Sequence, residues 1–358
     1  MATTQLPATM LAWRKHRGSS KPVFEEVPVP KVSPTGVLCK MLASGVCRSD
    51  HSLLTIDKQA SWFEEKYTLG HEGCGQIVQL GSAVHEDKFQ VGDIVALHAV
   101  PGCGRQDCPE CSRDLSQLCE KGHHSGIGQD GFYAPYAAVD IRGVVKVPSG
   151  VTPAQAAVAT DAVNTAYHAI RRRAEVNAHE TIFLFGLGGL GFNALQILLH
   201  IGPRIIVSDI RQGRLDDAQK LGIPPCDIVP IGASPQEFVT GAKLDGKIDT
   251  VLDFVGTHQT FEDAQHIGHV SVRRGGKLIC IGSLDTENTI HMKIGTRKRL
   301  SYIFSYGGQV RDLEEVLQLI ADGSITPQVE TSKLAEFPQV LESLVGGEVR
   351  ARVALTHD

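Results

Sequence analysis

The chain has 358 residues, of which 42% are hydrophobic and 21% are charged, and its formal net charge at pH 7 is −5. This length supports two domains with separate cores, and the slightly acidic balance gives no reason to expect nucleic acid or a membrane as a partner. Residues 1–20 lack the apolar core of a signal peptide, so we expect a cytoplasmic protein. In that compartment the nine cysteines favour metal binding over disulfides.

The first 150 residues are typical of a β-rich, barrel-like domain. Short apolar runs alternate with glycine and proline, as expected for antiparallel strands. The clearest predicted strands are 36–47, 73–81 and 91–100. A helix is then predicted to begin after Thr152, which suits an N-cap, with Pro153 at the first helical position.

Strands and helices alternate from Thr181 onward, which predicts a parallel, doubly wound sheet. The expected strands are 181–185, 204–209, 249–256, 276–282 and 299–306, and the expected helices are 191–201, 213–222 and 260–270. Residues 181–202 are apolar but contain five glycines, so they indicate a buried strand, turn and helix rather than a membrane span. The last predicted elements are amphipathic helices at 311–323 and 334–347 and a strand within 348–358.

A glycine-rich turn follows the first strand of this sheet. Gly186, Gly188 and Gly191 have the G-x-G-x-x-G spacing, with Gly189 and Leu190 inside it. The first glycine permits a tight turn, the second lets the backbone approach a pyrophosphate, and the third packs the helix against the strand. We therefore expect a dinucleotide site, with a purely structural turn as the alternative.

An acidic residue stands where a dinucleotide-binding domain selects its cofactor. Asp209 lies 18 residues past Gly191, at the end of a predicted strand. A carboxylate there accepts the ribose hydroxyls of NAD and repels the extra phosphate of NADP. Arg211 and Arg214 follow it, and a basic residue at this point could tolerate that phosphate. NAD is the expected cofactor, and Arg214 is counted among its candidate contacts.

Four cysteines fall within a polar loop of 17 residues. They are Cys103, Cys108, Cys111 and Cys119. Four thiolates at this spacing can close a tetrahedral zinc site without an open position, which would order a loop of little apolar content. An iron–sulfur cluster is the alternative, and free buried cysteines are a weaker one.

Cys47, His71 and Glu72 are candidates for a second metal site. Each has an ordinary explanation taken alone: a small buried cysteine, a core histidine and a surface carboxylate. Their occurrence in one chain with a dinucleotide turn and a cysteine loop favours catalysis.

With these motifs the sequence resembles the zinc-dependent alcohol dehydrogenases of the medium-chain dehydrogenase/reductase superfamily. The resemblance covers nearly the whole chain and rests on the order of its motifs. These are Cys47 to Asp50, the GHE sequence from Gly70 to Glu72, the four-cysteine loop, the "AYHAI" segment, the "GLGGLG" turn and the closing strand. It implies a GroES-like catalytic domain from 1–160 and 301–358 and a Rossmann domain from 161–300. It also implies a homo-oligomer, a tetramer or a dimer.

The resemblance implies a role for each matching residue. Cys47 and His71 would bind a catalytic zinc, and Glu72 would stand beside it as an exchangeable ligand. Asp50 would orient His71. Ser49 would hydrogen-bond the substrate hydroxyl and start proton transfer. The implied cofactor contacts are Arg48 and Arg352 at the pyrophosphate, and Val255, Gly256, Ile281 and Gly282 near the nicotinamide. The implied pocket wall contains Trp62, Ala99 and Ile127.

The chain departs from the family pattern at three points. Asp161 stands where the family usually has a cysteine as third catalytic ligand; a carboxylate can bind zinc with the same charge, and the alternative is that Asp161 caps a helix beginning near Ala162. Four residues, rather than two, separate Cys103 from Cys108. The position of the usual relay histidine holds Ser52, with His51 one residue earlier, so a relay through either residue, or none, stays open.

The expected function is reversible hydride transfer between an alcohol and an aldehyde or ketone, with two zinc ions and NAD. One alternative is reduction of a conjugated C=C bond or an iminium, with zinc as a spectator or absent. Another is a non-catalytic NAD-binding protein stabilised by the structural zinc. A small-molecule alcohol or carbonyl compound is the expected partner, of medium size or aromatic because of Trp62 and Phe63.

Overall fold

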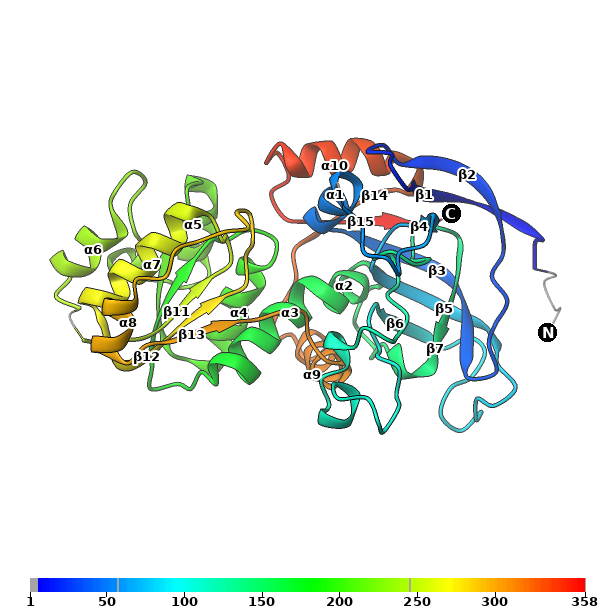
Figure 1. Cartoon of the computed structure of the whole chain (residues 1–358), viewed down its shortest axis with the longest axis horizontal. Coiled ribbons are helices and arrows are strands. Elements are labelled where there is room, and N and C mark those ends of the chain that lie inside the picture. The colour runs from blue at the N-terminus through cyan, green and yellow to red at the C-terminus, as the bar shows by residue number, and fades with distance from the viewer. Residues whose placement is uncertain (1–5, 57, 245, 358) are drawn as a thin grey trace. The chain divides into compact units, whose positions relative to one another are not determined.

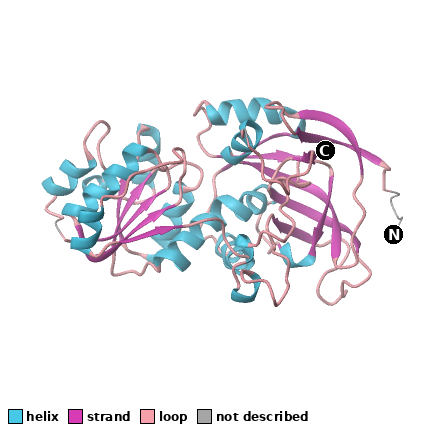
Figure 2. Cartoon of the chain, in the orientation of Figure 1, coloured by secondary structure: helices cyan, strands magenta, loops and turns pink. Residues whose placement is uncertain are grey.

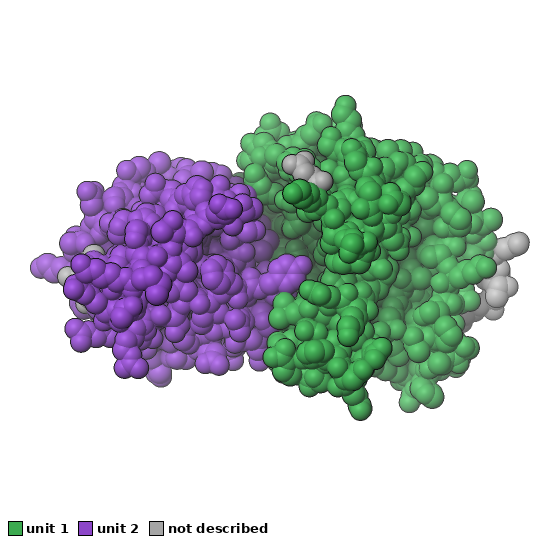
Figure 3. All heavy atoms as spheres, in the orientation of Figure 1, with its two compact units in different colours: residues 1–164, 309–323, 327–358 green, residues 165–308, 324–326 purple. Residues whose placement is uncertain are grey.

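The computed structural model of the chain describes residues 6–56, 58–244 and 246–357, which form two compact units (Figure 1). Figure 3 shows the first unit in green and the second in purple. The first unit comprises Met1–Asn164, Gln309–Gly323 and Pro327–Asp358, and the second comprises Thr165–Gly308 and Ser324–Thr326. The divisions fall after residues 164 and 308, whereas 160 and 300 were expected. Asp161 therefore belongs to the first unit, and residues 301–308 belong to the second.

Strands dominate the first unit (Figure 2), as the sequence predicts. One sheet has the order β2-β1-β4, and the larger one has the order β14-β15-β3-β5-β6-β8 with β7 paired to β3. The strands are β1 Thr9–His16, β2 Val23–Pro28, β3 Gly36–Val46, β4 Lys66–Thr68, β5 Glu72–Leu80, β6 Ile94–His98, β7 Tyr136–Asp140, β8 Val144–Lys146, β14 Val329–Lys333 and β15 Arg352–Thr356.

The long strand β3 is the centre of the larger sheet because it pairs antiparallel with β5, β7 and β15. Its apolar side chains pack with those of β5 and β6 into a buried core. That core includes Val37, Met41, Ile77, Val95 and Leu97. Burial of each large apolar side chain contributes about 1.5–3 kcal/mol, and together these side chains stabilise the framework. The framework places the ends of β3 and β5, where Cys47 and His71 lie.

The helix after Thr152 begins where the sequence predicts, whereas the helix Arg48–Thr55 was not predicted and the last helix begins at Phe337 rather than at residue 334. Thr152 caps the helix α2, accepting a hydrogen bond from the Gln155 amide, and Pro153 is its first residue. The helices are α1 Arg48–Thr55, α2 Pro153–Val158, α9 Val310–Ala321 and α10 Phe337–Val345. A π-helical turn, Ala159–Val163, follows α2 directly.

The second unit contains a five-stranded sheet in which every described pairing is parallel, as predicted. Its order is β10-β9-β11-β12-β13, with helices on both faces (Figure 1). The strands are β9 Thr181–Phe185, β10 Arg204–Ser208, β11 Ile248–Asp253, β12 Val272–Cys280 and β13 Ser301–Phe304. The helices are α3 Asn164–His168, which starts at the end of the first unit, α4 Gly191–Ile201, α5 Gln212–Lys220, α6 Pro235–Gly241, α7 His258–Val270 and α8 Met292–Lys298. Across the described residues, no helix has the length and apolar character to cross a membrane.

The C-terminal end of β15 is held by a half-buried histidine. The His357 Nε2 lies 2.9 Å from the Ser44 hydroxyl, and its amide donates to the Leu42 carbonyl at 3.4 Å. Burial lowers the pKa of His357 to about 4, from an ordinary value near 6.5. The folded protein therefore binds fewer protons here than the unfolded chain, so this site destabilises the fold as pH falls from about 6.5 to about 4.

We predict that His357→Gln makes stability less sensitive to acid. The wild type loses unfolding free energy between pH 7 and pH 5, and the variant should lose about 2 kcal/mol less. This is the value expected for a histidine whose pKa is 6.5 in the unfolded chain and 4 in the folded protein. Urea unfolding at the two pH values measures it, with the exposed His179→Gln as control. An unchanged pH dependence in His357→Gln would contradict this account.

Candidate active site

The four cysteines of the polar loop converge in a lobe of the first unit, which we call the cysteine lobe (residues 103–119). The Sγ atoms of Cys103 and Cys111 are 3.7 Å apart, and so are those of Cys108 and Cys119. All four are free thiols whose ligand atoms lie within 4.8 Å of one another. Zn–S bonds of about 2.3 Å in a tetrahedron place two sulfurs about 3.8 Å apart, so the lobe fits a closed zinc site.

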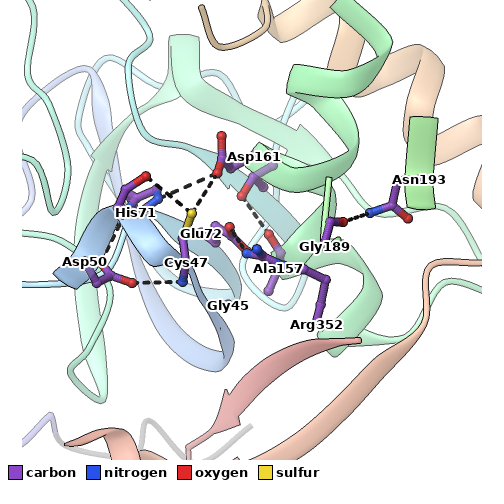
Figure 4. Close-up of polar contacts among 12 residues, drawn as sticks. Gly45, Cys47, Asp50, His71, Glu72, Ala157, Asp161, Gly189, Asn193 and Arg352 are labelled. Atoms are coloured by element: carbon purple, nitrogen blue, oxygen red, sulfur yellow. Dashed lines mark hydrogen bonds and ion pairs between the residues drawn. The ribbon is translucent and has the colours of Figure 1, made fainter. Parts of the chain in front are cut away.

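A second group of donors converges from separate elements of the first unit (Figure 4). It consists of Cys47, His71, Glu72 and Asp161, which we call the mixed-ligand centre. The Asp161 Oδ2 lies 3.5 Å from the Cys47 Sγ and 3.7 Å from the His71 Nε2. A tetrahedral zinc would hold such a sulfur and oxygen about 3.6 Å apart. The donor set and its spacing therefore fit zinc.

Cys47 occupies the N-cap of helix α1, immediately after strand β3. The Asp50 Oδ2 accepts a hydrogen bond from the Cys47 amide at 3.0 Å, which secures this first turn. The change from strand to helix thus fixes the position of this donor.

His71 is oriented by Asp50, as the resemblance implies. The Asp50 Oδ1 lies 3.3 Å from the His71 Nδ1, which leaves the Nε2 facing the other donors. The Tyr133 hydroxyl donates to the Asp50 Oδ2 at 2.7 Å and so holds the carboxylate in turn. Gly70 has a positive φ of 91°, and a Cβ there would lie 2.4 Å from the Tyr133 ring. The glycine of the GHE sequence is therefore needed for this packing.

Asp161 lies inside the π-helical turn Ala159–Val163, so the alternative role as a helix cap near Ala162 is wrong. The helical segment begins nine residues earlier, at the Thr152 cap. A π turn is rare, and such turns are often found at functional sites. Asp161 is the one donor of its group that is not fully buried, and its carboxylate points toward Cys47 and His71 (Figure 4).

Glu72 is fully buried and forms an ion pair with the Arg352 guanidinium on β15. Burial raises the pKa of Glu72 to about 7, although the charge of Arg352 opposes that rise. The resemblance implies a pyrophosphate contact for Arg352, which stays a prediction; in the structure its guanidinium is 4% exposed and faces Glu72.

The mixed-ligand centre favours a positive charge. Burial by itself would lower the pKa of His71, but Asp50 and Asp161 raise it well above its ordinary value. A protonated imidazole and a bound cation satisfy the same carboxylates, and both can contact the Cys47 sulfur. This electrostatic balance, together with the donor spacing, supports a divalent metal.

The residues that follow Cys47 on α1 are open to solvent. Arg48 and Ser49 are exposed, and His51 is half-buried. The Ser49 Oγ lies 3.4 Å from the Cys47 Sγ, which places a hydroxyl beside the mixed-ligand centre. The proton relay through His51 or Ser52 stays a prediction.

The glycine turn of the second unit has the expected geometry. Gly186 has a φ of 83°, which only glycine adopts readily. A Cβ on Gly191 would lie 1.8 Å from the Gly186 carbonyl oxygen, so helix α4 and strand β9 meet more closely than a side chain allows. The Asn193 side chain donates to the Gly189 carbonyl at 2.8 Å and closes the turn (Figure 4).

Asp209 is tied to this turn and to a neighbouring arginine. Its Oδ2 accepts from the Leu187 amide at 2.6 Å, and its Oδ1 lies 3.1 Å from the Arg211 Nε. Arg214 is buried instead, donating to the Leu187 carbonyl at 2.7 Å and lying over the Phe192 ring at 4.2 Å. The cofactor contact expected of Arg214 stays a prediction, whereas the structure shows it supporting the turn.

The loops after β11 and β12 lie against each other at the carboxyl edge of the sheet. The Asp253 carboxylate accepts from the amides of Val255 and Gly256, each at 2.9 Å. The Asp253 carbonyl accepts from the Ile281 and Gly282 amides at 2.9 and 3.0 Å. Ligands of doubly wound sheets bind at this edge. Asp253 is a residue that the sequence reasoning missed, although its place at the end of a strand was a signal.

The expected pocket residues gather around aromatic rings. Trp62 is 39% exposed and contacts Phe63 at 4.6 Å and His124 at 4.7 Å between ring centroids. Ile127 packs against the buried cluster that contains Phe63. The Ala99 carbonyl accepts from the Ser125 amide at 2.9 Å, two residues before Ile127.

Comparisons with known proteins show the family of this chain. Residues 33–149 match the alcohol dehydrogenase GroES-like domain, and residues 189–322 match the zinc-binding dehydrogenase family. An alcohol dehydrogenase from Geobacillus stearothermophilus is 30% identical over 93% of this chain and 96% of its own. Cinnamyl alcohol dehydrogenase 2 from Oryza sativa subsp. japonica is 26% identical over 98% and 95%.

A solved structure is also similar over nearly its whole length. It is an acetophenone reductase from Geotrichum candidum NBRC 4597 in complex with NAD, with a TM-score of 0.87 and 31% identity over 99% of this chain and 98% of that one. The chain belongs to the zinc-containing alcohol dehydrogenase family of the medium-chain dehydrogenase/reductase superfamily. The predicted fold class, a GroES-like unit with a Rossmann-like parallel sheet, is confirmed, and so are the two candidate zinc sites.

We predict that Asp161→Ala removes one metal ion per chain and leaves the cysteine lobe loaded, because the lobe keeps all four of its own donors. Elemental analysis of the purified full-length protein measures this loss. Asp161→Cys is the matched control, since it restores a charged donor and should keep both ions. An Asp161→Ala protein that retains both metals and full activity would show that Asp161 is not a ligand.

Proposed function

We propose that the protein is an NAD-linked alcohol dehydrogenase or carbonyl reductase, an enzyme of reversible hydride transfer between an alcohol and an aldehyde or ketone. The observation that carries the proposal is the convergence of Cys47, His71 and Asp161 at distances that suit one zinc ion. The first unit offers this metal centre and the second a dinucleotide turn, and we propose that both serve one reaction.

Residues of the mixed-ligand centre have distinct parts in this proposal. Zinc, when bound, supplies a Lewis acid for the substrate oxygen. Cys47, His71 and Asp161 hold it, and Asp50 keeps the His71 Nε2 directed inward. Ser49, whose hydroxyl lies 3.4 Å from the Cys47 sulfur, takes the proton of the alcohol and passes it outward through His51 or Ser52. Glu72 and Arg352 form a neutral pair beside the donors.

The proposed cofactor contacts follow from the second unit. The glycine turn from Gly186 to Gly191 receives the pyrophosphate at the start of α4, where free amides face an anion. Asp209 accepts the ribose hydroxyls, and the loops at Val255 and Ile281 border the nicotinamide. Arg48, Arg214 and Arg352 remain proposed contacts from the resemblance. The NAD in the acetophenone reductase structure supports the choice of cofactor.

An aryl-substituted alcohol or ketone is the proposed substrate. Trp62 presents an exposed indole held by two neighbouring rings, which suits a flat apolar group. The names of two relatives, an acetophenone reductase and a cinnamyl alcohol dehydrogenase, point to the same class of molecule. Both support the proposal without naming one compound.

Association with further copies of the chain is also proposed. The edge strand β13 exposes Phe304, and Tyr306 follows it, with exposed fractions of 64% and 59%. Apolar side chains on an open strand edge favour pairing with a second copy. The mass in solution by light scattering tests this, and a monomer at micromolar concentration would disprove it. A cytoplasmic location stays a proposal as well.

The proposed activity predicts turnover of 1-phenylethanol with NAD and of acetophenone with NADH, at a protein content of two zinc ions per chain. Product analysis with cinnamaldehyde separates it from the reductase of conjugated bonds: reduction at the carbonyl gives cinnamyl alcohol, and reduction at the C=C bond gives the saturated aldehyde. One zinc per chain with the saturated product would favour that alternative. Binding of NAD without turnover of any of these compounds would favour the non-catalytic protein.

The cofactor assignment predicts that Asp209→Ala weakens NAD more than NADP. Loss of hydrogen bonds to a charged group should raise the KM for NAD roughly 10- to 100-fold and change that for NADP far less. Initial rates with each cofactor measure the effect. Asp216→Ala removes an exposed carboxylate from the neighbouring helix α5 and serves as control. Equal losses for both cofactors would overturn the assigned preference.

A further inference from the structure

In the first unit, the buried side chain of Asn164 contacts the backbone of the buried residue Gln309. Asn164 is fully buried and Gln309 is 1% exposed. The Asn164 Nδ2 donates to the Gln309 carbonyl at 3.3 Å across 145 positions of sequence. Burial of an amide without a hydrogen bond is unfavourable, so the Asn164 Nδ2 depends on this contact, whereas no hydrogen-bond partner is described for its Oδ1. Gln309 contacts the cysteine lobe, whereas Asn164 adjoins the turn that carries Asp161.

Gln309 holds the cysteine lobe. Its Nε2 donates to the Asp114 carbonyl, and its Oε1 accepts from the Arg311 Nε at 2.8 Å. The Arg311 Nη1 forms an ion pair with the Asp114 carboxylate at 3.0 Å. Asp114 ends the short helix of Cys111 in a left-handed conformation, with its amide bonded to the Cys111 carbonyl at 3.2 Å. Gln309 and Arg311, at the start of α9, therefore bind the turn that follows Cys111.

Asn164 holds the turn that carries Asp161. It follows the π-helical turn directly, and its amide donates to the carbonyls of Ala159 and Asp161. A π turn lacks the regular hydrogen bonds of an α-helix, so tertiary contacts must fix its geometry. The Asp161 carboxylate must stay near 3.5 Å from the Cys47 sulfur, and metal donors tolerate displacements of only about 0.5 Å. The position of Asn164 thus determines where the Asp161 carboxylate lies.

We infer that Gln309 and Asn164 are positioning residues that couple the cysteine lobe to the mixed-ligand centre. An ordered lobe holds Asp114 in place, and the Asp114 carbonyl holds the Gln309 side chain. The Gln309 backbone carbonyl in turn holds the Asn164 side chain at the end of the Asp161 turn. A metal in the lobe thereby increases the metal affinity of the mixed-ligand centre, and the reverse holds because coupling between two binding sites is reciprocal. The lobe thus acts on the centre although the two share no donor. The inference concerns metal binding and does not depend on the substrate or the cofactor.

The competing account is that the pair only satisfies buried amides. Gln265 offers a matched control for it, because it is a fully buried amide of the second unit that donates to the Thr289 carbonyl at 2.8 Å. Loss of either amide should lower thermal stability. Only loss of Gln309 or Asn164 should alter the metal geometry of the first unit.

The test uses full-length protein with zinc in the cysteine lobe and Co²⁺ in the mixed-ligand centre. Gln309→Met and Asn164→Leu keep the side-chain size and remove the donors. We expect both variants to shift the visible Co²⁺ spectrum and to weaken Co²⁺ binding roughly 5- to 150-fold, the usual range for coupled sites. Gln265→Met should keep the wild-type spectrum and affinity. Wild-type spectra and affinities in both first-unit variants would overturn the inference.

A double-mutant cycle tests the direction of coupling. Cys119→Ser removes a lobe ligand and should weaken Co²⁺ binding at the mixed-ligand centre in the wild-type background. The same change made in Gln309→Met should add no further loss, because the connection is already broken. A full additional loss in that background would show that any coupling bypasses Gln309. If Cys119→Ser does not fold, the spectrum of Asn164→Leu decides the question.

Discussion

Negative charge gathered around one point of the first unit is the constraint on which the rest of this structure depends. The Cys47 sulfur and the Asp161 carboxylate lie 3.5 Å apart, with His71 and the buried Glu72 beside them. Carboxylates held this close in a low-dielectric interior repel one another, so a cation at this point is favourable. The neighbouring Arg352 offsets the charge of Glu72. The remaining charge is what the divalent metal of a zinc-containing dehydrogenase supplies.

The surroundings of this point hold the donors at fixed positions. Tyr133 holds Asp50, Asp50 holds both the Cys47 amide and the His71 ring, and Gly70 leaves room for the Tyr133 ring. A donor supported in this way loses little further freedom when the ion binds, so more of the metal–ligand energy appears as affinity. Asp161 differs, because its π turn depends on packing against distant segments. Its supports at Asn164 and Gln309 are therefore part of the same centre.

The sequence predicted features that depend on neighbours along the chain. The Thr152 cap, the glycine turn and the spacing of the cysteine lobe are local, and each has a chemical pattern that needs no knowledge of the fold. Contacts between residues far apart in the chain could not be predicted from the sequence. No motif pairs Tyr133 with Asp50 or Arg352 with Glu72. An arginine near a nucleotide site can face a phosphate or support a turn, and only packing shows that Arg214 is buried. A π turn likewise has no simple periodicity in the sequence. The sequence could therefore match Asp161 to the family's ligand position, but it could not predict the turn that carries the residue.

As the proposed third zinc ligand, Asp161 would replace a thiolate by a carboxylate without changing the charge of the site. Oxygen is a harder donor than sulfur and gives the metal less electron density, which leaves a stronger Lewis acid. A carboxylate has a shorter bond to zinc and a longer reach from the backbone than cysteine. The same backbone turn cannot serve both donors equally well. We propose that the redirected π turn, held by the contact of Asn164 with the Gln309 backbone, suits that difference in reach and ties the acidity of a bound metal to the packing of the segments around it.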